Sequence, residues 1–165
     1  MNDVLAAWTV APDSPLRPEV VALLEEHLRD MHATSPAESV HALDPAALAA
    51  PGTAFWTARS GEGAVLGCVA LQDLGAGHVE LKSMRTATVA RRRGVGAGLL
   101  DRVLAEAEAA GHERISLETG TEPYFAPART LYRSRGFEEC PPFGHYALDP
   151  HSVFLTRRLG AGRRS

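Results

Sequence analysis

Residues 91–98 read RRRGVGAG, three consecutive arginines followed by glycines at positions 94, 96 and 98. Because glycine lacks a Cβ atom, the backbone of such a segment can come close to a ligand. The segment stands directly before a stretch with helical hydrophobic spacing, so its amides are expected to point out of a helix start that carries partial positive charge. With the arginine charges upstream, this arrangement predicts a site for a pyrophosphate group.

Two common phosphate-binding motifs do not fit this segment. A P-loop needs a lysine directly after its last glycine, and no lysine follows here. A dinucleotide fingerprint needs a further glycine three residues after Gly96, where Leu99 stands. The alternative interpretation is a flexible, glycine-containing loop whose arginines are simply solvated. The position of the segment directly before a long amphipathic stretch disfavours this alternative.

The elements that must position this segment follow from the hydrophobic pattern. Val95, Leu99 and Val103 predict a helix over residues 94–110, and further helices are expected at 17–33, 45–49 and 126–134, with Asp44 capping the short one. Strands are expected at residues 4–10, 53–59, 64–74, 78–88, 113–118, 137–140 and 152–156, with a turn over 11–15. This order predicts an α+β (mixed α/β) fold around one sheet, mainly antiparallel early and with a late strand–helix–strand crossover.

Length, composition and charge narrow the class of protein. The chain has 165 residues, of which 45% are hydrophobic, so one domain over residues 1–159 is expected, followed by a frayed tail at 160–165. The 17 basic and 20 acidic residues give a net charge of −3, which argues against nucleic-acid binding. We find no secretory signal or membrane-spanning stretch, and the distant Cys68 and Cys140 fit two buried free thiols in a reducing compartment. A cytoplasmic protein is expected.

Three segments, in order along the chain, carry a resemblance to a known family. Residues 91–96 match the pattern Gln/Arg-x-x-Gly-x-Gly/Ala, residues 81–86 read LKSMRT, and residues 128–137 read A-x-x-L-Y-x-x-x-G-F. They resemble the signature, the fourth strand and the helix-to-strand motif of the GNAT superfamily of acyl-CoA-dependent N-acetyltransferases, over about residues 80–137. The segments SVHALD (39–44), ETG (118–120), PFG (142–144) and DPxSVF (149–154) are similar to a bacterial subgroup of small-molecule acetyltransferases.

The resemblance implies a GNAT-like single domain with a mostly antiparallel sheet of about six to seven strands, flanked by helices and split between strands four and five. Acetyl-CoA would be the acyl donor, and its pantetheine arm would lie in the split and pair with the backbone of residues 84–86. Arg91 and Arg92 would assist the backbone in holding the pyrophosphate. The implied cofactor-binding residues are Met84, Arg85, Thr86, Arg91, Arg92, Gly94, Val95, Gly96, Ala97 and Gly98. The sequence departs from the family where many members carry an asparagine after the fifth strand, and Thr119 or Thr121 would have to substitute.

Transfer of an acetyl group from a thioester to an amine needs a neutral amine, a stabilised carbonyl oxygen and a proton for the leaving thiolate. The resemblance puts Tyr132 opposite the cofactor sulfur, where a phenol that stays protonated at neutral pH can donate that proton. Packing beside Phe137 is the alternative role for this tyrosine. Glu80 is the first candidate for a general base that acts through a water molecule. The alternative is that Glu80 is a strand residue that only faces solvent. Glu118 is the second candidate, and could instead orient the loop that follows it.

The acceptor pocket of the family is walled by the first helix, the segment after it and the last hairpin. The residues implied for these walls are His32, Ser39, His41, Phe143 and Tyr146. His41 and Asp44 could instead cap the short helix, and two histidines do not define a metal site. The chemistry requires no metal, because positioning the two reactants can itself remove much of the barrier.

These observations predict an enzyme that moves an acetyl group from acetyl-CoA to a primary amine of a small molecule, by direct transfer in a ternary complex. Two alternatives stay open, namely an acetyltransferase that modifies proteins and a catalytically silent acyl-CoA-binding sensor. The expected partner is the small-molecule amine, without nucleic acid or membrane. Paired protomers are common in the family, so a homodimer is also compatible with the sequence.

Overall fold

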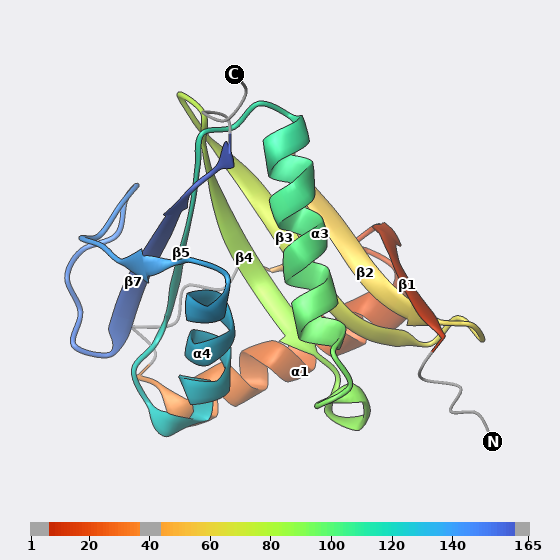
Figure 1. Cartoon of the computed structure of the whole chain (residues 1–165). Coiled ribbons are helices and arrows are strands. Elements are labelled where there is room, and N and C mark those ends of the chain that lie inside the picture. Colours follow the sequence, from red (N-terminus) through yellow and green to blue (C-terminus); the bar gives the residue numbers. More distant parts are fainter. Residues whose placement is uncertain (1–6, 37–43, 161–165) are drawn as a thin grey trace.

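The computed structural model describes residues 7–36 and 44–160, which form a seven-stranded sheet with helices on both faces (Figure 1). The strand order is β1-β2-β3-β4-β5-β7-β6. The strands are β1 Trp8–Pro12, β2 Thr53–Ser60, β3 Val65–Gly75, β4 His78–Thr86, β5 Arg114–Gly120, β6 Glu138–Glu139 and β7 Ser152–Arg158. The helices are α1 Pro18–Thr34, α2 Pro45–Leu48, α3 Val95–Ala109 and α4 Ala126–Ser134, with 3-10 turns η3 Thr88–Ala90 and η4 Pro123–Phe125. The predicted α+β fold class is confirmed.

The strands β4 and β5 are the parallel pair of this sheet, and they are paired over only a short length. The pairing joins His78 to Arg114 and ends where Glu80 faces Ser116. Because β4 continues to Thr86 and β5 to Gly120, the two strands separate beyond that point, as Figure 1 shows for the green and teal arrows. The predicted split between strands four and five is therefore present.

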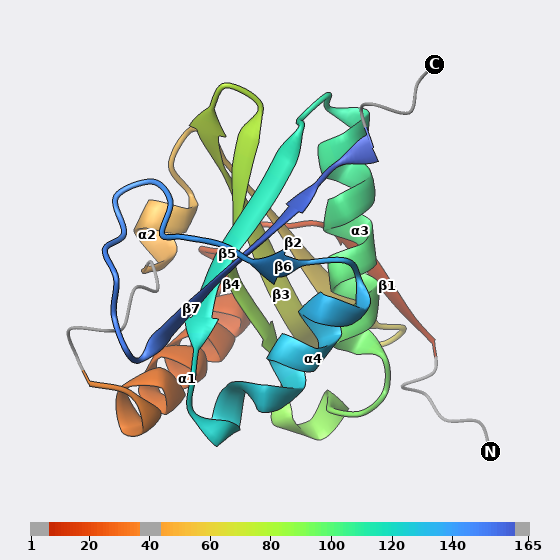
Figure 2. The same ribbon diagram turned by 60° about the vertical axis from the view of Figure 1, so that its left-hand side comes forward.

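The central strands bury both of their faces, each against a different helix. Along β3, Val69 and Leu71 belong to the core on the α3 side, whereas Cys68 and Ala70 belong to the core beneath α1. Successive side chains of a strand point to opposite faces, so a strand covered on both sides is apolar at nearly every position. Figure 2 shows α1 and α3 on opposite sides of the sheet. The split therefore opens between two covered faces.

The first strand lies further along the chain than predicted. Residues 11 and 12, expected to belong to a turn, extend β1 and pair with Thr57 and Trp56 of β2. Pro12 ends an edge strand, where its missing amide costs no ladder hydrogen bond. Residues 1–6, which include the start of the predicted strand, lie outside the described residues.

Smaller expectations can also be compared with the structure. Asp44 caps α2 as predicted, because its Oδ1 accepts a hydrogen bond of 2.8 Å from the Ala47 amide. Both cysteines are free thiols, but Cys140 is only partly buried. Gly160 of the predicted tail is held by Glu108, and residues 161–165 lie outside the described part of the chain. Within residues 7–36 and 44–160, no helix has the length and apolar character that a bilayer crossing needs.

Candidate active site

The start of α3 presents unpaired backbone amides. Gly94 precedes the helix with a φ of 82°, in the left-handed region that favours glycine. Within the described ranges, the amides of Val95, Gly96 and Ala97 have no hydrogen-bond acceptor, as expected for the first residues of a helix. Gly98 is the fourth residue of the helix, and its amide donates a hydrogen bond of 2.9 Å to the carbonyl of Gly94, the residue before the helix. The structure therefore removes Gly98 from the predicted set of pyrophosphate donors.

Two of the glycines in this segment have different surroundings. A Cβ atom on Gly98 would lie 2.3 Å from Cη2 of Trp8, so glycine is required there for the packing of α3 on β1. A Cβ atom on Gly96 would meet only ordinary contacts, 3.4 Å from Thr86 Oγ1 and 3.8 Å from Met84 Cε. The start of α3 thus lies beside the end of β4, which brings Met84 and Thr86 together with the free amides.

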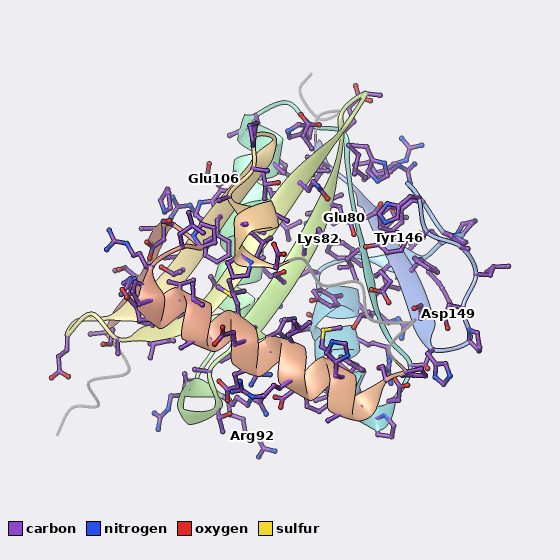
Figure 3. All side chains as sticks on the ribbon, turned by 180° about the vertical axis from the view of Figure 1, so that it is seen from behind. Glu80, Lys82, Arg92, Glu106, Tyr146 and Asp149 are labelled. Carbon is purple, nitrogen blue, oxygen red and sulfur yellow. The ribbon has the colours of Figure 1, made fainter. Side chains whose placement is uncertain are left out.

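The arginines before α3 lie at the surface. Arg91 and Arg92 are both exposed in the turn between η3 and α3, where Figure 3 labels Arg92. Arg92 has a φ of 67°, which is uncommon for a residue with a side chain. Their guanidinium groups stand next to the free amides in sequence and add positive charge to this end of the helix.

Arg85 uses its side chain to join elements of the scaffold. Its side chain is 3% exposed, and its guanidinium pairs with Asp30 at 2.7 Å and Glu26 at 3.2 Å, both on α1. It also donates to the Tyr124 hydroxyl at 3.0 Å. The hydrogen bond from Arg85 holds the pKa of Asp30 below its usual value. Of Arg85, therefore, only the backbone is left for the predicted pairing with pantetheine.

The strand β4 is irregular where it leaves β5. Ser83 and Met84 together face Val69 of β3, which is a β-bulge, and Ser83 has a φ of 55°. The Ser83 hydroxyl is buried and has no hydrogen-bond partner in the described part of the chain. Bulges re-aim side chains and are frequent beside active sites. Here the bulge lets Ser83 and Met84 line the same cavity.

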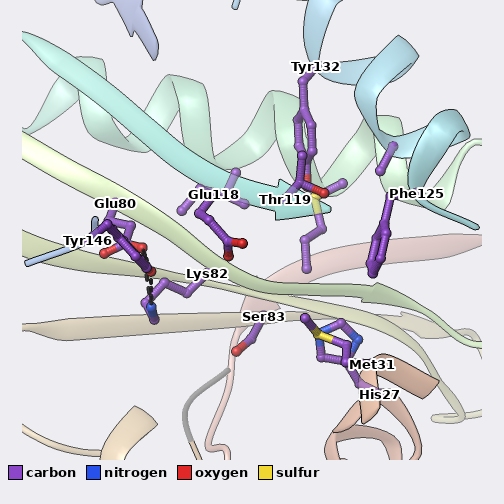
Figure 4. A pocket seen from close by; sticks show the side chains of 13 residues that line it. His27, Met31, Glu80, Lys82, Ser83, Glu118, Thr119, Phe125, Tyr132 and Tyr146 are labelled. Carbon is purple, nitrogen blue, oxygen red and sulfur yellow. Dashed lines mark hydrogen bonds and ion pairs between the residues drawn. The ribbon is translucent and has the colours of Figure 1, made fainter. Parts of the chain in front are cut away.

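A cavity of about 90 Å³ occupies the split (Figure 4). Its walls come from β4, β5, α4 with η4, α1 and the loop before β7. The lining residues are His27, Met31, Glu80, Leu81, Lys82, Ser83, Met84, Glu118, Thr119, Phe125, Ala128, Tyr132 and Tyr146. The three predicted catalytic residues are thus brought together in one cavity, although they come from β4, β5 and α4.

Tyr132 projects from α4 into this cavity. It is 5% exposed, and its ring packs edge-on against Phe137 with the centroids 5.8 Å apart. Its hydroxyl has no hydrogen-bond partner among residues 7–36 and 44–160. Burial raises the pKa of Tyr132 well above its ordinary value, so the phenol stays protonated. The two roles considered for Tyr132 are therefore compatible, because the ring packs on Phe137 while the hydroxyl has no partner among the described residues.

Glu118 lies on the β5 side of the split, and the pKa of its carboxyl group is raised. Its Oε2 accepts a hydrogen bond of 2.7 Å from Ser152 Oγ on β7. Burial raises the pKa of Glu118 to about 7, because removal from water disfavours the charged carboxylate. A carboxyl group in this range can exchange a proton near neutral pH.

Glu80 is not a solvent-facing strand residue, since it is only 2% exposed. Its Oε2 accepts hydrogen bonds from the Tyr146 hydroxyl at 2.5 Å and from Lys82 Nζ at 3.2 Å. Lys82 Nζ also donates to the Tyr146 hydroxyl at 3.0 Å. Glu80, Lys82 and Tyr146, which we call the β4 cluster, therefore form a closed triangle on one wall of the cavity (Figures 3 and 4).

The sequence interpretation missed Lys82, although a signal was present. Lys82 is the only lysine of the chain and stands two residues after Glu80, which puts both side chains on one face of a strand. Its side chain is 6% exposed, although lysine is almost never fully buried unless it is paired. A lone lysine inside a strand next to a candidate base could have been included as a site residue.

The predicted acceptor-binding residues divide into three groups. Tyr146 lines the cavity, while Phe143 packs behind it with the ring centroids 5.2 Å apart. His32 is exposed on α1 and does not line the cavity, whereas His27 and Met31, four residues apart on one face of that helix, do. Burial lowers the pKa of His27 to about 4, so this side chain is neutral at pH 7. Ser39 and His41 lie outside the described residues.

The two threonines proposed to replace the family asparagine differ in position. Thr119 lines the cavity, whereas the exposed Thr121 donates its hydroxyl to the Pro150 carbonyl at 3.2 Å. Thr119 is therefore the one of the two that a ligand in the split could touch. In the described ranges, no three histidine, cysteine, aspartate or glutamate side chains gather as metal ligands would.

Comparison with known proteins agrees with this geometry. Residues 20–137 match the acetyltransferase (GNAT) family. The chain is 48% identical to the uncharacterized N-acetyltransferase YsnE of Bacillus subtilis, over 86% of this chain and 93% of that protein. It is 43% identical to the IAA acetyltransferase of Azospirillum brasilense, over 92% and 97% of the two chains. A GNAT family acetyltransferase from Elizabethkingia anophelis, solved with acetyl-CoA bound, shares the fold with a TM-score of 0.66 at 18% identity, over 92% of this chain and 98% of that one.

The enzymes of this family use acetyl-CoA as the acyl donor. The residues present fit that donor, because unpaired amides at the start of α3 suit a diphosphate and the adjoining split is open between β4 and β5. The family match covers most of the chain and includes α1, the split, α3 and α4. The chain therefore belongs to the acetyltransferase (GNAT) family and is an acetyl-CoA-dependent N-acetyltransferase.

Proposed function

We propose that the protein transfers an acetyl group from acetyl-CoA directly to a primary amine of a small molecule, with both substrates bound at once. The observation that carries this proposal is the cavity in the split, which joins Tyr132 and Glu118 next to the free amides of α3. A donor held by its diphosphate at α3 can extend along the unpaired edge of β4 toward Tyr132. An acceptor would then enter from the side of Glu118 and Tyr146.

In this proposal Glu118 is the general base. An alkyl amine is mostly protonated at pH 7, so a group that removes a proton raises the fraction able to attack. Glu118, with its pKa raised to about 7 by burial, is half ionised at that pH. Glu80 was ranked first from the sequence, but its carboxylate is already held by Lys82 and Tyr146. The geometry therefore favours Glu118 over Glu80 for this role.

Tyr132 is the proposed general acid. As the bond from the nitrogen to the acetyl carbon forms, the C–S bond of the thioester breaks, and the sulfur leaves as a thiolate that takes the proton of Tyr132, which regains a proton from the acetylated nitrogen. The Tyr132 hydroxyl has no protein partner in the described residues, and its raised pKa keeps the proton available. The amide near Met84, at the bulge of β4, is the proposed donor to the carbonyl oxygen as it becomes negative.

A small acceptor is supported by two observations. The cavity measures about 90 Å³ and is lined by residues from β4, β5, α4 with η4, α1 and the loop before β7, which suits a small group better than a folded protein surface. The Azospirillum brasilense relative is named for a small molecule, IAA. The presence of both Tyr132 and Glu118 in the cavity favours turnover over a silent sensor.

The experiment is to offer acetyl-CoA and a panel of amines, amino acids, peptides and IAA to the purified protein, and to measure the release of CoA thiol. We expect thiol release only when a small primary amine is present, with the acetylated amine detected by mass spectrometry. Glu118→Gln should reduce this rate, whereas Glu138→Gln, which alters an exposed glutamate of β6, should not. Tight acetyl-CoA binding without thiol release across the panel would instead support a sensor, and acetylation of peptides alone would support protein modification.

A further inference from the structure

The β4 cluster contains a charge that the proposed chemistry does not use. Lys82 Nζ lies 3.2 Å from Glu80 Oε2 and 3.0 Å from the Tyr146 hydroxyl, and both charged side chains are almost fully buried. Taking an ammonium and a carboxylate out of water costs several kcal/mol, and hydrophobic residues of similar size often serve stability equally well. Stability alone therefore does not explain why this ion pair is buried in the cavity of an enzyme.

The position of the β4 cluster suggests that role. Lys82 and Glu80 line the same cavity as Glu118, from the facing strand. Tyr146 reaches the cluster from the loop between β6 and β7 and is fixed there by both side chains. The cluster thus holds that loop against β4, and it places one positive and one negative side chain across the cavity from Glu118, the proposed base.

Glu118 senses charges from several elements. Apart from burial, the groups that act on its carboxyl are Lys82 and Glu80 on β4, Ser152 on β7 and Asp149 in the loop before it. Tyr132 on α4, Tyr146 in the same loop and the neutral His27 on α1 complete the cavity around it. The positive charge of Lys82 favours the ionised form of Glu118, while Glu80 and Asp149 disfavour it.

We propose that Lys82 is a positioning residue for acetyl transfer. Its side chain fixes Glu80 and Tyr146 in one cluster on the cavity wall and presents a positive charge to the facing Glu118. This inference rests on the proposed function, because it assigns Lys82 a task only if Glu118 is the base.

The two halves of the ion pair should have opposite effects, and this separates the proposal from a structural role. Removal of Lys82 takes away the positive charge that favours the ionised form of Glu118, so Glu118 would hold its proton to higher pH. Removal of the Glu80 charge leaves Lys82 unopposed, so Glu118 would lose its proton at lower pH. If the pair served only to hold the fold together, both variants would weaken the same contact and change the enzyme in the same direction.

The experiment measures kcat/KM against pH for the wild type, Lys82→Met and Glu80→Gln, with the same amine acceptor throughout, so that the ionisation of the acceptor is constant. In Lys82→Met the acid limb should move up by about 1 pH unit, which lowers the rate at pH 7 roughly fivefold and restores it near pH 9. In Glu80→Gln the limb should move to lower pH. Lys82→Arg should restore the wild-type limb, and Arg158→Gln, which removes a positive charge from the exposed end of β7, should leave it in place.

A second readout does not depend on activity. The titration of the Glu118 carboxyl can be followed by NMR in protein labelled at glutamate with carbon-13, and assigned by its loss in Glu118→Gln. The same opposite displacements are expected there. If Lys82→Met does not fold, Glu80→Gln alone decides: titration of Glu118 at lower pH supports the proposal, and an unchanged or higher titration pH contradicts it.

The outcomes separate this inference from the proposed function. Absence of acetyl transfer by the wild type would overturn the function, whatever the titrations show. An active wild type whose limb moves in the same direction in both variants, or in neither, would overturn the role of Lys82 and leave the function standing.

Discussion

The two ends of the β4–β5 pair bury polar side chains in different ways. At the paired end, His78 Nε2 meets Ser116 Oγ at 2.7 Å, and Ser116 Oγ meets Thr156 Oγ1 at 2.8 Å. Burial lowers the pKa of His78, so this chain of hydrogen bonds is neutral at pH 7. At the separated end, Lys82 Nζ lies 3.2 Å from Glu80 Oε2, and burial raises the pKa of the Glu118 carboxyl to about 7.

The difference shows what separation of the strands achieves. Where β4 and β5 are paired, the backbone groups satisfy one another and the side chains need only neutral hydrogen bonds. Where the strands part, the backbone edge of β4 becomes free for a ligand, and ionisable side chains line the cavity between the strands. One strand pair thus supplies a rigid joint at one end and a reactive cavity at the other.

The largest effect is expected for the proposed acid at the separated end. Tyr132→Phe removes the hydroxyl and keeps the ring that packs on Phe137, so kcat should fall by about 100-fold or more with acetyl-CoA affinity nearly unchanged. Ser116→Ala, which removes a hydroxyl at the paired end, should change kcat by less than about twofold, measured by thiol release at saturating substrates. An unchanged rate in Tyr132→Phe would remove Tyr132 from the mechanism.

The glycines of α3 should separate binding from folding. Gly96→Leu fills the space beside Thr86 and Met84 at the free amides, so the Kd for acetyl-CoA should rise about tenfold or more, measured by calorimetry. Gly98→Ala places a methyl group against Trp8, so it should lower the free energy of unfolding by about 1–3 kcal/mol while the folded fraction binds normally. Equal affinity in Gly96→Leu and wild type would mean that the donor lies elsewhere.

Glu118 should carry a stability cost that depends on pH. A carboxyl whose pKa is raised from 4.5 to about 7 favours the folded state below pH 4.5, and that contribution is lost as the pH rises through 7. Glu118→Gln should therefore be more stable than the wild type at pH 8, by up to about 3 kcal/mol, with the difference vanishing near pH 4.5. Denaturant unfolding at both pH values checks this, with Glu138→Gln as the exposed control. A difference independent of pH would contradict the raised pKa.

The paired scaffold was largely predictable from the sequence, because local patterns determine it. The spacing of Val95, Leu99 and Val103 predicts α3, and Gly111 marks its end. The identity of the fold came from the spacing of three motifs around residues 80–137. The sequence pattern did not show that Pro12 lies on an edge strand, where a proline is tolerated, so residues 11 and 12 were predicted as a turn.

The cavity was predictable only in part, because its geometry depends on contacts between distant residues. Glu80, Glu118 and Tyr132 were identified by resemblance, but the choice of base between Glu80 and Glu118 depends on Lys82 and Tyr146, which are 64 residues apart in sequence. The bulge at Ser83 has no signal in the strand pattern. His27 was missed in favour of His32, because the face of α1 that meets the split follows from packing.

The most direct test of the account is to follow the backbone amides of α3 by NMR as the ligand is added. With CoA, the resonances of Val95, Gly96 and Ala97 should shift strongly and that of Gly98 weakly, since its amide is already bonded to Gly94. Pantetheine, which has no diphosphate, should leave all four nearly unchanged. Saturation with CoA that leaves Val95, Gly96 and Ala97 unshifted would contradict the claim that these amides hold the diphosphate of the donor.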